Sequence, residues 1–175
     1  NGQPVAATSA TWGSYSDVLS IHAKYAIDID GIGLELVYGN QTGNAGRIGA
    51  LDYNDLDETS YSAKITYGNF AADYRKNDSG NSGYAKGVNT GNVEGTSMCG
   101  MYTMGNVGLA ACQVNTSQND SNANTNDATT RTYSADYQLG GGVVLGVVYF
   151  DVEETANSVD RTDVTGIATK LSIGF

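Results

Sequence analysis

The two cysteines stand on either side of a short turn signal, and their spacing could support one covalent bond. Cys99 and Cys112 flank Gly105-Asn106 at equal distances, and Gly and Asn both tolerate the positive φ angles of a two-residue hairpin turn. Such a turn places the cysteines directly opposite each other on neighbouring antiparallel strands, with their side chains on one face. The sequence therefore predicts a disulfide in an oxidising compartment, and two reduced thiols are the alternative.

A short acidic stretch, "DYNDLDET", gathers oxygen atoms of the kind that bind calcium. It lacks the glycine and the distal glutamate of an EF-hand loop. A solvated acidic loop is therefore the simpler interpretation, and a calcium ion is its alternative. The candidate ligands are Asp52, Asn54, Asp55, Asp57 and Glu58.

His22 is the only histidine of the chain, and no motif for nucleophilic catalysis, phosphate binding or zinc coordination accompanies it. We therefore expect neither an enzyme nor a cofactor, apart from calcium at the acidic loop. A small barrel enzyme that acts on lipids, with His22 and a nearby serine, is an alternative of a different class. The net charge of −10 argues against nucleic acid as a partner, because phosphate binding needs clusters of Lys and Arg.

Strands must position these residues, because the chain holds 23 Gly, 12 Tyr and a single Pro, with only 16% charged residues. Tyr and Thr favour strands, and Gly and Asn favour tight turns. Apolar and polar side chains alternate with a period of two, which predicts strands with one apolar and one polar face. The expected strands lie at about 18–29, 32–38, 61–67, 70–74, 98–104, 107–111, 133–139, 143–149 and 164–175.

Short and long connections alternate along the chain. In an up-and-down meander this puts the short turns at one end and the long loops at the other, as in outer-membrane barrels. A soluble β-sandwich for surface binding or adhesion, which has tight turns at both ends, is the alternative fold. The short turns are Asp30-Gly31, Gly68-Asn69, Gly105-Asn106 and Gly140-Gly141-Gly142, and the long polar loops lie at about 40–59, 76–93, 115–130 and 152–163.

The two faces of the expected strands differ in chemistry. Tyrosines stand near both ends of the apolar faces, as they do at the two interfaces of a membrane. Lys64 should lie opposite Asp73 across the Gly68-Asn69 turn, so that the wall charges nearly balance and the acidic loops favour cations weakly. The opposite faces suit a water-filled lumen, and the predicted pore-lining residues are His22, Lys24, Glu35, Lys64, Asp73, Arg75, Asp136 and Lys170.

Two stretches, "YSADYQLGGGVVLGVVYFD" and the terminal "ATKLSIGF", resemble the C-terminal half of a Gram-negative general diffusion porin of the alphaproteobacterial type. The resemblance implies an all-β transmembrane barrel of about sixteen antiparallel up-and-down strands. Residues 1–175 would form a single segment of it, with about nine strands, the eighth to the sixteenth. It also implies that Phe175 belongs to the signal read by the barrel-assembly machinery, and that the protein is a homotrimer.

The expected function is therefore passive diffusion of small hydrophilic solutes and ions across the bacterial outer membrane, with selectivity set by pore width and wall charge. The expected partners are outer-membrane lipid and lipopolysaccharide. Divalent cations could bridge the acidic external loops to the phosphates of lipopolysaccharide.

Overall fold

The computed structural model describes residues 15–46, 52–86, 91–119, 125–156 and 159–174. Within them the chain forms one antiparallel sheet of nine strands, in which each strand pairs with its neighbours in chain order. This is the predicted up-and-down meander. The strands are β1 (Tyr15–Ile29), β2 (Ile32–Ala45), β3 (Leu56–Tyr67), β4 (Phe70–Gly80), β5 (Gly91–Met104), β6 (Val107–Asn119), β7 (Thr125–Gly140), β8 (Val143–Ala156) and β9 (Val159–Ile173).

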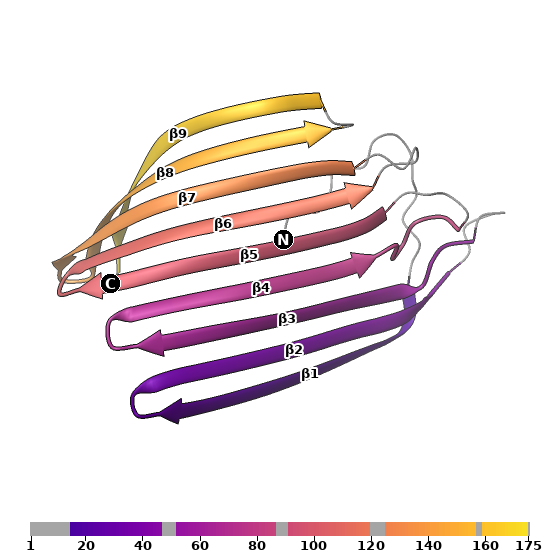
Figure 1. The fold of residues 1–175 in the computed structure, drawn as a ribbon, viewed down its shortest axis with the longest axis horizontal. Coiled ribbons are helices and arrows are strands. Elements are labelled where there is room, and N and C mark those ends of the chain that lie inside the picture. Colours follow the sequence, from indigo (N-terminus) through magenta and orange to yellow (C-terminus); the bar gives the residue numbers. More distant parts are fainter. Residues whose placement is uncertain (1–14, 47–51, 87–90, 120–124, 157–158, 175) are drawn as a thin grey trace.

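The short turns all lie at one end of the sheet, at the left in Figure 1, and the longer connections lie at the other. Asp30 and Gly31 have φ angles of 52° and 82°, which suit the turn type that matches the twist of two paired strands. The register is the predicted one, because Ile27 pairs with Leu34 and Tyr25 with Leu36. A slip of one residue would move every apolar side chain of a strand to the opposite face.

Most strands extend further into the polar stretches than predicted. β6 and β7 continue to Asn119 and start at Thr125, although residues 115–130 were expected to form a solvated loop. A ladder pairs backbone groups whatever the side chains are, and polar side chains add bonds here. Thr129 Oγ1 donates to Asn115 Oδ1 at 3.2 Å, and Asn115 Nδ2 donates to Thr96 Oγ1 at 3.3 Å. The other three predicted loops are likewise shortened by strand extensions.

The described residues contain almost no packed core. Only Tyr53 and Ala156 are buried apolar residues among them, whereas Tyr67 is 63% and Ile167 is 72% exposed. A β-sandwich would bury its apolar faces between two sheets, but the described strands form a single sheet. The β-sandwich alternative is therefore wrong. β1 and β9 form the two edges, so the sheet is open. Figure 1 shows that it is also curved.

In the part of the chain that the structure describes, no helix is long and apolar enough to cross a membrane.

Candidate pore-lining face

The register places all eight predicted pore-lining residues on one face of the sheet. Directly opposed residues of an antiparallel pair point to the same side, and Glu35, Lys64 and Asp73 follow one another in a row across β2, β3 and β4. The row continues through β5 to β9, where Asp136 and Lys170 flank Gly146 on the same side. We call this side the pore face and the opposite side the lipid face.

Opposite charges meet on the pore face of β1 to β4. Lys24 Nζ lies 2.7 Å from Glu35 Oε2. Lys64 lies directly opposite Asp73, as predicted, but Asp73 Oδ1 makes its ion pair with Arg75 Nε, two residues along its own strand, at 3.7 Å. Pairs as exposed as these stabilise the fold little, because water screens their attraction. Their consequence is electrostatic, because they nearly cancel the charge of this part of the wall.

The predicted disulfide is present. Cys99 pairs with Cys112 across β5 and β6, with the two Cα atoms 4.1 Å apart, and a bond joins the two sulfur atoms. Cys99 lies opposite Asp73, so the disulfide faces the pore side, as expected. It covalently joins two adjacent strands in the middle of the wall.

We expect the Cys99→Ser/Cys112→Ser double variant to lose up to about 3 kcal/mol of stability, the scale set by closing a loop this short. Urea unfolding from lipid vesicles, with and without reductant, measures the loss. Reduced wild type should match the double variant, whose own unfolding should not respond to reductant. Two alkylated thiols in the unreduced wild-type protein, seen by mass spectrometry, would refute the bond.

The lipid face carries an apolar band with aromatic rings at both borders. At the end with the long connections, the rings of Tyr61 and Tyr74 lie 6.4 Å apart, and those of Tyr133 and Tyr149 lie 6.2 Å apart. At the turn end Phe70 pairs with Tyr102. Two aromatic girdles around an apolar band are the mark of a strand wall embedded in a membrane.

Charged clusters lie on the lipid face beyond the aromatic border at the end with the long connections. Arg131 Nη1 contacts Asp151 Oδ2 at 3.1 Å and Glu153 Oε1 at 2.8 Å. Lys76 Nζ contacts Glu94 Oε2 at 3.1 Å. The hydrogen bond from Arg131 lowers the pKa of Glu153, and the hydrogen bond to Glu94 raises the pKa of Lys76. Glu153 and Lys76 therefore stay ionised at neutral pH.

The model of one protein family, described as Gram-negative porin, matches residues 1–161 of this chain. The chain belongs to the Gram-negative porin family. No curated protein sequence matches it.

Two solved structures of OmpT, an outer-membrane protein of Vibrio cholerae, share the fold of this porin chain. The form expressed in the outer membrane has a TM-score of 0.60 at 11% identity, with 89% of this chain and 56% of that chain covered. The form folded in vitro has a TM-score of 0.57 at 10% identity, with 89% and 55% covered. The chain thus spans about half the length of these structures. The family and the fold place the protein in the bacterial outer membrane.

Residues 52–55 of the β2–β3 connection and 81–86 of the β4–β5 connection bond to each other in this porin, which the sequence did not predict. Asn54 N donates to Tyr84 O at 2.8 Å, and Gln118 Nε2 of β6 donates to the Tyr84 hydroxyl at 2.7 Å. Tyr53 pairs with Ala85 and is only 4% exposed. Burial raises the pKa of Tyr84. The sequence signal for this contact was one tyrosine in each polar stretch, Tyr53 and Tyr84.

The calcium alternative receives no support from the geometry. Asp57 and Glu58 are consecutive residues of β3 and point to opposite faces, Asp55 Oδ1 accepts the Ala45 N–H at 2.8 Å, and Asn54 Nδ2 donates to Tyr84 O. Among the described residues, no group of three or more His, Cys, Asp or Glu is placed to hold a metal ion. The structure therefore does not gather the predicted ligands, which are Asp52, Asn54, Asp55, Asp57 and Glu58, into a site.

His22 faces Ser60 across Gly39 on the pore face. A Cβ atom at Gly39 would lie 2.8 Å from His22 Nδ1 and 2.7 Å from Ser60 Oγ. Both side chains thus use the space above one glycine, although no hydrogen bond between these two described residues is present. The pair lies on the charged side of the sheet, away from the apolar face that lipid tails would contact.

The pore face of β8 is apolar from Val144 to Phe150, which the sequence analysis missed. Val144, Val148 and Phe150 all lie on this face, and the Phe150 ring covers Gly166 of β9. The signal was the unbroken apolar run "VVLGVVYF", which has no polar side chain on either face. The predicted assembly residue Phe175 lies outside the described residues.

Proposed function

We propose that the full-length protein forms a water-filled channel through which small hydrophilic solutes and ions diffuse passively. The observation that carries the proposal is the separation of the two faces. One face holds an exposed apolar band with aromatic borders, and between those borders the charged side chains lie on the other face. An apolar band in lipid leaves the charged face on the inside of a closed barrel, where only water can solvate it.

The wall charges support a channel without strong selectivity. Lys24, Arg75 and Lys64 lie next to Glu35 and Asp73, so this part of the wall attracts neither sign of ion strongly. Acidic residues gather toward the end with the long connections, Glu58 among them. We infer a vestibule that concentrates cations weakly. The proposal involves no reaction and no cofactor, and the homotrimer, the contacts with lipopolysaccharide and the recognition by the assembly machinery stay predictions.

Reconstitution of the full-length protein into planar bilayers should give stepwise increases in conductance. A salt gradient should give a reversal potential with weak cation preference, which fades as the Debye length falls from about 10 Å at 0.1 M to about 3 Å at 1 M salt. Reversal-potential measurements across that range are the test.

The absence of conductance steps from correctly folded protein would contradict the channel. Anion preference at low salt would contradict only the charge argument, and would point to a dominant positive wall in the part of the barrel that this chain does not form. Heat-modifiable migration on gels, a property of folded barrels, serves as the control for folding.

A further inference from the structure

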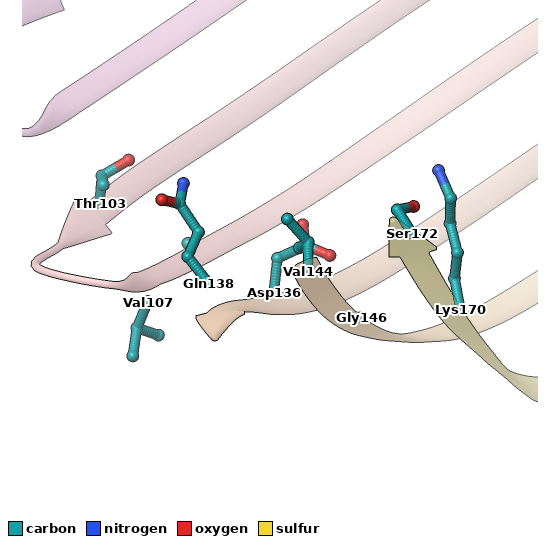
Figure 2. A pocket seen from close by; sticks show the side chains of 9 residues that line it. Thr103, Val107, Asp136, Gln138, Val144, Gly146, Lys170 and Ser172 are labelled. Carbon is teal, nitrogen blue, oxygen red and sulfur yellow. The ribbon is translucent and has the colours of Figure 1, made fainter. Parts of the chain in front are cut away.

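A depression lies in the pore face at Gly146, near the turn end of the sheet (Figure 2). Gly146 lies between Asp136 of β7 and Lys170 of β9, each directly opposite it. Along its own strand, Val144 and Val148 are the next residues on the same face. The cavity has a volume of about 400 Å³, and Thr103, Gln138 and Ser172 add polar groups to its lining.

The missing side chain at position 146 is what opens the depression. The carboxylate of Asp136 lies where a Cβ atom of residue 146 would be, with Oδ1 as the nearest atom. Gly108 lies opposite Asp136 on its other side, so no side chain from β6 pushes the carboxylate away. Any larger residue at position 146 would displace Asp136 and fill the space between the two charges.

The two charged groups of the depression are available to a ligand. Neither Asp136 nor Lys170 makes an ion pair or hydrogen bond with another described side chain, in contrast to Glu35 and Asp73 on β2 and β4. Two strand spacings separate their backbones, or roughly 10 Å. The Lys170 side chain extends from β9 on the same side of the sheet as Asp136 (Figure 2), and its long, flexible stem can adjust the gap.

We propose that this depression binds a small zwitterion, such as an amino acid, on its way through the channel. The ammonium group of the ligand contacts Asp136, its carboxylate contacts Lys170, and its carbon skeleton lies beside Val144, in the space between these two charged groups. The proposal deepens the proposed function, because it assigns a solute class to one point of the channel wall. Gln138 and Ser172 solvate the ligand from the turn end, and Thr103 does so from β5, beyond Gly108.

Other solute classes fit the depression less well. A simple anion would meet the negative Asp136, and a simple cation would meet the positive Lys170. An uncharged solute would leave both charges without a partner of opposite sign. Only a solute with both charges satisfies both side chains by charge-assisted hydrogen bonds, which are about twice as strong as neutral ones.

Saturation-transfer NMR on the full-length protein folded in detergent tests the site, with 4-aminobutyrate as the probe. We expect saturable binding of this zwitterion. N-acetyl-4-aminobutyrate, which lacks the ammonium, and 4-aminobutyramide, which lacks the carboxylate, should each bind at least about fivefold more weakly, the scale of one lost charge-assisted hydrogen bond in a partly solvated site.

Single-site variants separate this depression from the general field of the wall. Asp136→Asn, Lys170→Gln and Gly146→Val should each weaken binding of the probe at least about fivefold. Asp73→Asn and Lys64→Gln remove the same charges elsewhere on the pore face and are the matched controls. An equal loss in a control and its partner variant would overturn the site, as would unchanged binding in Gly146→Val.

A second measurement distinguishes failure of the site from failure of the channel. Liposome swelling with an uncharged sugar reports the channel alone, whereas the NMR experiment reports binding without any transport. Swelling without specific binding of the probe would overturn the zwitterion site and keep the channel. Specific binding without swelling would overturn the channel and keep the site.

Discussion

Ile65→Arg should destabilise the protein by about 2–4 kcal/mol, the cost of an arginine on the lipid face of a barrel near the bilayer midplane. Ile65 lies between Tyr61 and Tyr67 on the apolar face of β3, where it pairs with Leu34 and Ala72. Its side chain is exposed, so in the membrane it contacts lipid rather than protein. Equilibrium unfolding by urea from vesicles of defined lipid, followed by fluorescence or by gel shift, measures the loss.

Thr66→Arg is the matched control, because it introduces the same side chain one residue further along β3. Thr66 pairs with Gly33 and Ala71 on the pore face, where an arginine remains in water. We expect its stability to change by less than about 1 kcal/mol, because the side chain of an arginine at this half-buried position can extend into water. If Thr66→Arg were the more damaging variant, the assignment of the two faces would be reversed. If both were harmless, this sheet would not be embedded in lipid.

The pairing of the strands could be predicted because it depends on local signals. Each two-residue turn fixes which residues lie opposite each other, so Asp30-Gly31 sets the pairing of Ile27 with Leu34. In the same way Gly105-Asn106 sets the pairing of Cys99 with Cys112. A period of two then assigns each side chain to a face. The eight residues predicted to line a pore share one face because both signals agree along the described strands.

The ends of the strands could not be predicted in the same way. Hydrophobic alternation stops where the apolar band stops, but the hydrogen-bonded ladder continues into water. Thr116 and Ala128 still pair between β6 and β7, although nothing in "NTSQNDSNANTNDATT" alternates. A polar strand and a polar loop have the same composition, and only the neighbouring strand decides between them.

Contacts between segments that are distant in the sequence could not be predicted either. The bond from Gln118 to the Tyr84 hydroxyl joins residues 34 positions apart, and no spacing rule connects them. The depression at Gly146 needs Asp136 and Lys170 from two other strands. Both residues were predicted to line the pore, but the space between them depends on Gly146. Nothing in the apolar run of β8 distinguishes this glycine as the place of a depression.

Gly142→Ala should be the most damaging small substitution in the turn between β7 and β8, with a loss of about 2–5 kcal/mol. Gly142 has a φ of +79°, where a side chain strains the backbone. A Cβ atom there would also lie 2.6 Å from the carbonyl oxygen of Gly174. Gly174 N donates to Gly142 O at 2.9 Å, so relief of the clash would break the bond that holds this turn to the residue following β9.

Gly141→Ala separates the clash from the backbone strain. Gly141 has a φ of +60°, but a Cβ atom there meets no atom within 4 Å. We expect it to lose only about 1–2 kcal/mol, the cost of a left-handed conformation for an alanine, and Gly141→Asn to lose less, since Asn tolerates that conformation. Urea unfolding from vesicles ranks the three variants. Equal losses for Gly141→Ala and Gly142→Ala would show that the Gly174 carbonyl does not constrain the turn.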